Sequence, residues 1–592
     1  MLFFLEWIQL LACLLGLSLA GGFILAPFRD RPPYLWLAAP LAGIAILSLG
    51  LTLGYTIDLP LVWSLPLNFL ILSGLTLWSL FRRPKPADIL LPGFLLLLVS
   101  GLCTATLQET TLRSKSPGVL LMDGSDALGY AHVSDWLRTH KSSQRPVIDP
   151  RFPYQSWPAY GRSDHRPGAY LFLAALALLR RESGLFTYDF ACALVLCAGL
   201  LGFAGAFARS KTGLLLLLVG AAVSTNFDLS RSGYFGKILA YPGAMLVVAL
   251  FLQSIEDMDT DKLSCIIALA LGVSLLQSGT SVALLLCIAW AGVPLGRLRD
   301  WISQPKQASF PSSPGPPVYA SFKNLVVLVG LAAGSWLLVR GGLPNQPMDM
   351  AWPRILRVGL DLQNYHLRYK VIPNLVLNGW LGAALLVQVI LAGVAFYRRN
   401  TAAMGLLGGL FFFLLAAWVL NLRWPFYQSV GALYLLAVAG TVRLWEDLPQ
   451  PLRGAYRAAI PLLFILLVGS RVPRFIIAVY RYTGSRVPAT QRYVKSDLDN
   501  IHTLIGDKTV DLRLPDIYAA LVVLVELGRQ NVKMQMDPDT WRVLVSYRGW
   551  PPPAVEKPGE FLLMMAKAHL PVPGGEILFQ NSQYILLRRP PD

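Results

Sequence analysis

The apolar positions of this chain fall into long runs that recur from the N-terminus to about residue 471 and then stop. A helix of roughly 20 apolar residues is long enough to cross a bilayer. Some of the runs are shorter than this, and we expect those to extend into flanking residues or to lie inside a bundle. A further stretch, 167–180, is too short to assign by length. The predicted spans are 5–26, 34–54, 60–80, 88–106, 188–208, 212–225, 238–254, 262–277, 280–296, 324–340, 374–396, 402–421, 429–443 and 457–471.

The composition agrees with this pattern, because 55% of the residues are hydrophobic and only 14% are charged. Soluble domains carry roughly 25% charged residues. Pattern and composition together predict a polytopic α-helical membrane protein with about 13–15 helices. The net charge of +17 then indicates basic loops on anionic lipid head groups, and we expect no nucleic-acid partner. The six cysteines lie in or beside apolar runs, without metal-ligand spacing.

Short basic loops between the runs predict the orientation, since such loops stay in the cytoplasm. Examples are Arg29 with Arg31, and Arg398 with Arg399. Alternation places the loops 107–166, 226–237, 341–373 and 422–428, together with the C-terminal region, on the non-cytoplasmic side. This scheme closes only if 167–180 dips in and returns, or lies along the interface. The predicted organisation is N-terminal transmembrane helices at 1–106, an outer loop with an acidic motif at 107–166, a transmembrane bundle at 167–471 and a C-terminal domain at 472–592.

The C-terminal region has the alternating pattern of a small α/β domain. We predict strands at 509–514 and 532–536 around a helix at 516–529, which Asp516 could cap. Residues 576–588 predict a hairpin. No Gly-rich nucleotide-binding loop is present in this region.

The first large outer loop carries the most informative segment, Met122-Asp-Gly-Ser-Asp126-Ala-Leu-Gly-Tyr-Ala-His132. Asp126 is expected just before an amphipathic helix, 128–137, that also carries His132. A carboxylate at the mouth of a hydrophobic bundle is costly unless it is solvated, paired or functional. After it comes the run Arg166-Pro-Gly-Ala-Tyr170, which opens the stretch 167–180.

These elements resemble the GT-C superfamily of membrane glycosyltransferases. In that superfamily a first outer loop carries an acidic residue and a helix often marked by His, and a Pro-Gly with an aromatic opens the next helix. The resemblance implies a GT-C-like bundle and an inverting transfer of a sugar from a polyprenyl-phosphate carrier to a glycan, lipid or protein acceptor. It further implies a multi-pass protein of a plasma membrane, such as the bacterial inner membrane, with a non-cytoplasmic active site. The chain departs from the family pattern because its acidic loop follows the fourth span, not the first.

The resemblance assigns roles to individual residues. Asp126 is the candidate catalytic base, with Asp123 as its nearest competitor and helix capping as its structural alternative. Arginines are the best partners for a leaving lipid phosphate. A divalent metal such as Mg²⁺ or Mn²⁺ could share that role, but no ligand set with recognisable spacing is present. The candidate substrate-binding residues are His132, Asp123, Asp164, His165, Asp228, Arg231, Arg354, Arg357 and Arg423.

Purely structural roles for several of these residues, and two other functions for the chain, stay open. Asp164 and His165 suit a helix cap, and Arg354 with Arg357 suit an interfacial helix on lipid head groups. The alternative functions are a lipid-linked glycan polymerase or ligase, and a lipid or solute transporter or flippase. The chain shows no internal repeat and no charges spaced through the middles of several spans, which a transport path would need.

Overall fold

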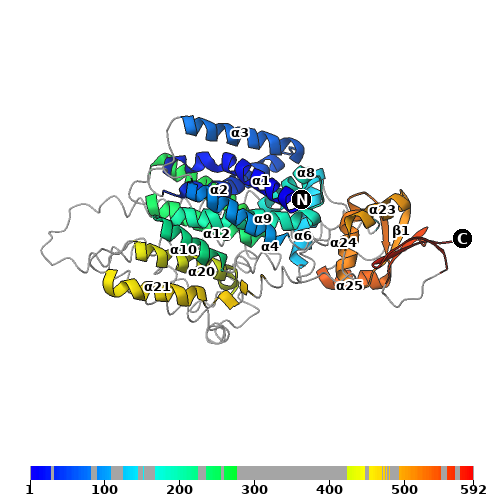
Figure 1. The fold of residues 1–592 in the computed structure, drawn as a ribbon. Helices are drawn as coiled ribbons and strands as arrows, with labels where there is room; N and C mark the ends of the chain where they lie inside the picture. The colour runs from blue at the N-terminus through cyan, green and yellow to red at the C-terminus, as the bar shows by residue number, and fades with distance from the viewer. Residues whose placement is uncertain are drawn as a thin grey trace.

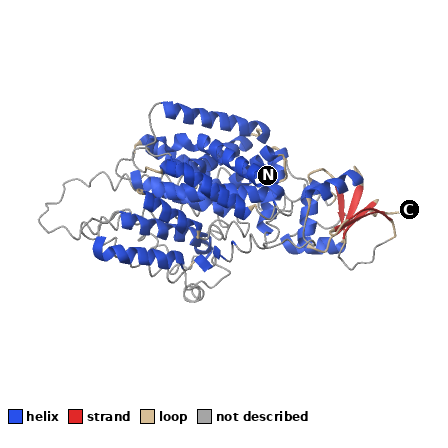
Figure 2. Ribbon diagram, in the orientation of Figure 1, coloured by secondary structure: helices blue, strands red, loops and turns tan. Residues whose placement is uncertain are grey.

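The chain forms a helical bundle followed by a small α/β domain with a five-stranded sheet (Figures 1 and 2). In this computed structural model the described residues are 2–28, 33–81, 90–108, 112, 125–144, 151, 167–223, 235–254, 259–276, 423–446, 453–469, 471–473, 475–476, 479, 493–548, 557–566 and 574–590.

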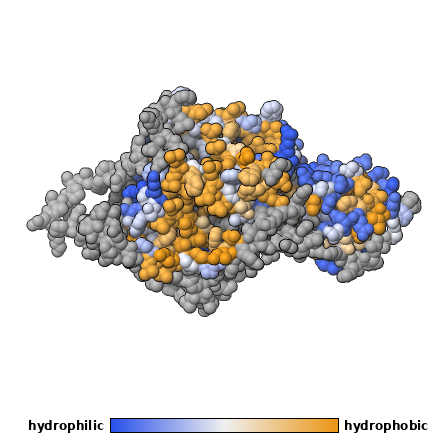
Figure 3. Space-filling model, in the orientation of Figure 1, coloured by the Kyte–Doolittle hydropathy of each residue, from blue (hydrophilic) through white to orange (hydrophobic). Residues whose placement is uncertain are grey.

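Among the described residues, five helices are long and apolar enough to cross a membrane. They are α1 (Leu2–Leu25, continued by a 3₁₀ turn to Phe28), α2 (Ala39–Thr56, preceded by a 3₁₀ turn at Leu35–Ala38), α3 (Leu61–Phe81), α4 (Leu90–Leu107) and α9 (Gly184–Phe207). They correspond to predicted spans. The most apolar stretch of α9 is completely buried, whereas only 28% of that stretch in α3 and 33% in α4 is buried. Large apolar side chains are therefore exposed on α3 and α4, and hydrophobic surface covers much of the bundle in Figure 3.

Shorter helices complete the described part of the bundle. They are α8 (Pro167–Arg180), α10 (Lys211–Ala222), α12 (Phe235–Ser254), α13 (Thr260–Leu276), α20 (Arg423–Glu446) and α21 (Arg453–Gly469). α10, α12, α13, α20 and α21 overlap the predicted spans at those positions. The predicted spans 280–296, 324–340, 374–396 and 402–421 lie outside the described residues.

The ambiguous stretch 167–180 forms helix α8, which lies inside the bundle. Its residues 167–177 are buried apart from the partly exposed Tyr170. An amphipathic interfacial helix exposes one whole face, and α8 has no such exposed face over these residues, which favours the alternative in which it lies inside the bundle. At about 1.5 Å per residue, α8 is about 21 Å long and too short to cross a bilayer alone. This agrees with the alternative in which the chain dips in and returns.

Close backbone contact holds α1 against α2. A Cβ atom added at Gly43 would overlap the carbonyl oxygen of Leu17, and one at Gly21 would overlap the backbone of Ala39 and Gly43. Small residues at such crossings let helix backbones approach when no side chain separates them. The two helices can pack this tightly because both contact positions are glycine.

Polar contacts mark the two ends of the bundle. At one end, Arg180 at the end of α8 donates to Glu6 near the start of α1, with Nη1–Oε2 at 2.7 Å. Ser183, at the start of α9, contacts the C-terminal domain at this same end. At the other end, Ser210 before α10 donates to Glu446 at the end of α20, with Oγ–Oε1 at 2.6 Å. The predicted alternation of cytoplasmic and non-cytoplasmic loops also places Glu6 and Ser183 at one end of the bundle and Ser210 and Glu446 at the other. Which side of a membrane each end faces stays a prediction.

The C-terminal domain contains α23 (Lys495–Ile505), β1 (Thr509–Arg513), α24 (Ile517–Gly528), β2 (Lys533–Met536), α25 (Pro538–Arg548), β3 (Phe561–Met565), β4 (Glu576–Gln580) and β5 (Tyr584–Arg588). The sheet has the strand order β2-β1-β3-β5-β4. β1 pairs in parallel with β2 and β3, and β5 pairs antiparallel with β3 and β4. The predicted strands, helix and hairpin are confirmed, whereas the exact domain boundary at residue 472 stays a prediction.

Local side-chain chemistry explains two of these elements. Asp516 is the N-cap of α24, as predicted, because its Oδ1 accepts from the backbone N–H of Ala519 at 2.8 Å. In the turn of the β4–β5 hairpin, Asn581 Oδ1 accepts from the N–H groups of Gln583 and Tyr584. Asparagine favours such turns because its side chain can bond to the backbone two residues on.

Candidate functional site

Most of the residues selected from the sequence cannot be placed. Asp123, Asp164, His165, Asp228, Arg231, Arg354 and Arg357 lie outside the described residues. The site can therefore be built only around the acidic-motif helix α6 (Ser125–Thr139) and the elements that hold it.

Asp126 lies in the first turn of α6, because the helix begins at Ser125, three residues earlier than predicted. Its position as second helical residue, and not the residue before the helix, corrects the expected location. A negative charge in a first turn is favoured by the partial positive charge of the helix N-terminus. The side chain of Asp126 is outside the described part of the chain.

His132 is on the same helix and is 2% exposed. It follows Asp126 by six residues, which is about 240° around the helix axis at about 100° per residue. The two positions are therefore on different faces of α6. His132 shares its face with Asp135, three residues later.

An aromatic cluster fixes α6 to three other helices. The ring of Tyr130 lies 5.0 Å from that of Tyr170 on α8, 5.8 Å from that of Phe235 on α12 and 6.4 Å from that of Tyr188 on α9, measured between centroids. The backbone N–H of Gly236 also donates to the Tyr130 hydroxyl at 3.2 Å. Tyr170, the aromatic of the Pro-Gly-Ala-Tyr run, thus packs directly on the acidic-motif helix.

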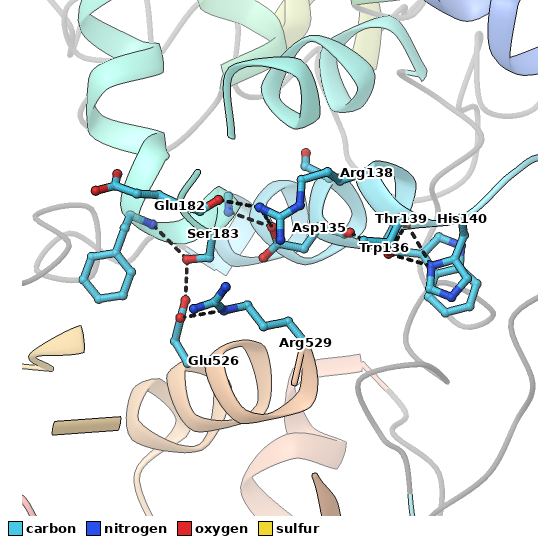
Figure 4. Close-up of polar contacts among 12 residues, drawn as sticks. Asp135, Trp136, Arg138, Thr139, His140, Glu182, Ser183, Glu526 and Arg529 are labelled. Atoms are coloured by element: carbon cyan, nitrogen blue, oxygen red, sulfur yellow. Dashed lines mark hydrogen bonds and ion pairs between the residues drawn. The ribbon is translucent and has the colours of Figure 1, made fainter. Parts of the chain in front are cut away.

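A buried polar network connects α6 with the turn between α8 and α9 (Figure 4). The backbone N–H of Gly184 donates to Asp135 Oδ1 at 2.8 Å. Arg138 Nη1 donates to the carbonyl oxygen of Glu182 at 2.5 Å and lies 3.9 Å from Asp135 Oδ1. Ser183 caps α9 by accepting from the N–H of Phe186. α6 therefore binds the first and last residues of this turn, Glu182 through the Arg138 guanidinium and Gly184 through the Asp135 carboxylate.

The same turn is held from the opposite side by the C-terminal domain. The hydroxyl of Ser183 donates to Glu526 Oε1 on α24, and Glu526 Oε2 accepts from Arg529 Nε at 3.0 Å. The side chain of Glu526 is completely buried. A second contact joins the backbone N–H of Met534, on β2, to the carbonyl oxygen of Arg151 at 3.0 Å. The α8–α9 turn thus lies between α6 and α24.

Burial dominates the electrostatics of the two carboxylates in this network. It raises the pKa of Asp135 to about 7, against the opposing effects of Arg138 and of the Gly184 hydrogen bond. Burial also raises the pKa of Glu526, although Arg529 and the Ser183 hydroxyl lower it. Asp135 Oδ2 has no hydrogen-bond partner in the described part of the chain. Two buried acids that titrate above their usual range are therefore close enough to influence each other.

The end of α6 is held by the connection between α2 and α3. Asp58 has a left-handed backbone, with φ at 64°, and accepts from the N–H and hydroxyl of Ser143 at 2.8 and 2.9 Å. These hydrogen bonds lower the pKa of the Asp58 carboxyl. The residues that follow α6 are thus tied to the connection between α2 and α3.

Arg423 is the first residue of α20, so the expected short outer loop at 422–428 is wrong from this residue onward, where the backbone is helical. Pro425 is compatible with this start, because a proline in a first helical turn loses no intrahelical hydrogen bond. α20 has 24 residues and ends at Glu446, which binds the start of α10. At about 1.5 Å per residue its other end lies about 35 Å away. That places the backbone of Arg423 towards the end of the bundle that carries the C-terminal domain.

Sequence reasoning missed Ser183, Glu526 and Arg471. Ser183 follows an apolar helix as an N-cap candidate, but nothing in the sequence links it to residue 526. Glu526 is the one charged residue in the apolar run of α24, and that isolation was a usable signal. Arg471 lies two residues after the end of α21 and is 1% exposed, and no pattern in the sequence indicated its burial.

No group of three metal-ligating side chains occurs in the described ranges. Comparison with protein-family models and with curated proteins finds no match to this chain.

Proposed function

We propose that the chain is a polytopic membrane glycosyltransferase of the GT-C type. It would transfer a sugar from a polyprenyl-phosphate carrier to a glycan, lipid or protein acceptor on the non-cytoplasmic membrane face. The observation that carries the proposal is the setting of the acidic motif: Asp126 lies in the first turn of a helix that packs against α8, α9 and α12 at the end of the bundle that contacts the C-terminal domain. The apolar exterior of α3 and α4 suits contact with a lipid-borne donor.

The reaction gives Asp126 the role of general base. Its carboxylate takes the proton of an acceptor hydroxyl while the acceptor oxygen bonds to the anomeric carbon of the sugar. The bond from that carbon to the phosphate oxygen breaks, and the lipid phosphate leaves with the electron pair. Attack from the face opposite the leaving group inverts the anomeric configuration.

The leaving phosphate needs a cation, and Arg423 is the candidate arginine whose backbone lies in the described part of the chain. An arginine offers two parallel N–H donors to phosphate oxygens. His132 shares α6 with Asp126 and is proposed to orient the substrate or its neighbouring groups. Mg²⁺ or Mn²⁺ binding to the phosphate would be compatible with this scheme.

Two other functions remain as outcomes of the test. A lipid-linked glycan polymerase or ligase would use a similar bundle but would take a whole glycan as donor. A transporter or flippase would move the carrier without breaking the sugar–phosphate bond. Release of the free carrier phosphate therefore distinguishes either enzyme from a transporter. The length of the glycan on the donor distinguishes the glycosyltransferase from the polymerase or ligase.

The decisive variant is Asp126→Asn in the purified full-length protein, assayed with a panel of polyprenyl-phosphate sugars. Removal of one positioned general base lowers a rate by roughly 10²–10⁴-fold. Donor affinity should change little, because other residues hold the phosphate. Asp123→Asn should be milder, and Arg423→Ala should weaken donor binding instead. Near-normal transfer by Asp126→Asn would remove this residue from the mechanism and with it the central point of the resemblance.

A further inference from the structure

The C-terminal domain contacts the bundle at the α8–α9 turn, which also binds α6. Glu526 and α6 both bind the turn formed by Glu182–Gly184. From one side, Asp135 accepts from Gly184 N–H and Arg138 donates to the Glu182 carbonyl. From the other side, Glu526 accepts from Ser183. Figure 4 shows Ser183 between Glu526 and the Asp135–Arg138 pair.

We infer that Glu526 is a positioning residue for the acidic-motif helix: by fixing Ser183 it fixes the α8–α9 turn against which α6 is registered. The C-terminal domain then controls the placement of Asp126 although it supplies no reacting group. The positional effect on catalysis rests on the proposed function, whereas the mechanical coupling of Glu526 to α6 does not.

The geometry leaves little freedom between the turn and α6. A Cβ atom at Gly184 would lie 2.7 Å from the carbonyl oxygen of Ala131, so the two backbones are already in direct contact. Any shift of the turn must therefore move α6 or break the Gly184–Asp135 hydrogen bond. Packed elements transmit displacement in this way because protein interiors are as dense as organic crystals.

Burial makes the Ser183–Glu526 bond consequential. A fully buried carboxylate that loses a hydrogen-bond donor has no water to replace it, so the domain contact would rearrange. Arg529, 3.0 Å from Glu526, has Asp499 at 4.0 Å as a second acidic neighbour. The ion pair therefore holds the glutamate from within the C-terminal domain, and Ser183 is its connection to the bundle.

The chain contains a matched control for this arrangement. Ser210 is the N-cap of α10 and, like Ser183, donates its hydroxyl to a glutamate, Glu446 on α20. This second serine–glutamate pair joins helices at the opposite end of the bundle, away from α6. A substitution made in both pairs removes the same chemistry in two places, and only one of them is expected to affect α6.

The experiment measures hydrogen–deuterium exchange of peptides covering residues 125–139 in the full-length protein in lipid nanodiscs. Ser183→Gly removes the bond to Glu526 while glycine remains a tolerable N-cap, and Ser183→Thr retains both functions. We expect roughly tenfold faster exchange of α6 amides in Ser183→Gly and Glu526→Gln. Ser183→Thr, Ser210→Gly and Glu446→Gln should leave α6 exchange at the wild-type rate.

Two results would overturn the inference. One is unchanged α6 exchange in both Ser183→Gly and Glu526→Gln. The other is equal acceleration by the Ser210 and Glu446 variants, which would indicate general loosening of the bundle. In the transfer assay, Ser183→Gly should lower kcat with little change in donor KM, and Ser183→Thr should restore it. Asp126→Asn should lose transfer with normal α6 exchange, so failure of the proposed chemistry is distinguishable from failure of the coupling.

Discussion

The contact between Gly184 and α6 leads to a sharp prediction, because one added methyl group must meet backbone there. The Cβ of Gly184→Ala would lie 2.7 Å from the oxygen and 3.0 Å from the Cα of Ala131. Neither atom can move without moving α6, in contrast to the far end of a flexible side chain. We therefore expect the substitution to push the α8–α9 turn and α6 apart.

The change in the free energy of unfolding combines one stabilising contribution, helix propensity, with two destabilising ones, overpacking and a lengthened hydrogen bond. Alanine is favoured over glycine in a helix by roughly 0.5–1 kcal/mol, and less at a first helical position. Overpacking in a dense interior costs roughly 1–3 kcal/mol. Displacement would also lengthen the hydrogen bond from Gly184 to the buried Asp135, and a bond to a charged group contributes roughly 1.5–3 kcal/mol. The net expectation is a destabilisation of about 1–3 kcal/mol.

Gly129→Ala is the matched control on α6 itself. A Cβ at Gly129 meets no atom of the described residues within 4 Å, so we expect only the helix propensity to change and the variant to be slightly stabilised. Both variants would be compared by thermal denaturation of the detergent-purified chain at one scan rate, together with hydrogen exchange of α6. If Gly184→Ala proved as stable as Gly129→Ala, the proposed tight registration of α6 on the turn would be refuted.

The remaining predictions concern pH, topology and the C-terminal domain. The Asp135 pKa of about 7, against 3.8 as the ordinary value, means that the folded state binds an extra proton between these pH values. The free energy of unfolding should therefore decrease as pH rises from about 4 to about 7. Denaturation curves of Asp135→Asn should show a smaller decrease over the same pH range. An equal decrease would exclude Asp135 as its source. In a cysteine-free background, cysteines at the exposed Lys141 and Ser582 should react with an impermeant reagent from outside, and one at Arg209 only after permeabilisation; labelling of only one of the first two would contradict the topology. Deletion from about residue 484 onward should leave slow transfer or donor hydrolysis in a folded bundle, and complete loss of chemistry with folding intact would place a catalytic group in the deleted region.

The sequence alone determined the elements whose signals are local. Apolar length predicted α1 to α4, Asp516 predicted the cap of α24, and the pattern of residues 576–588 predicted the β4–β5 hairpin. These succeed because a span, a cap and a tight turn are each decided by residues a few positions apart. The strand β3, Phe561–Met565, was not predicted, since a short uniformly apolar run does not distinguish a buried strand from a helix segment.

Only the tertiary structure decided how the acidic-motif helix is held. Ser183 and Glu526 are 343 positions apart, and no periodicity or propensity relates them. The buried state of α8 also depended on its neighbours, because its length and composition suit either an interface or an interior. Local chemistry determines the helices and turns of this protein. The burial of Ser183, Glu526 and Asp135 around one turn depends instead on packing, because all the surrounding elements must be in place before these side chains are buried.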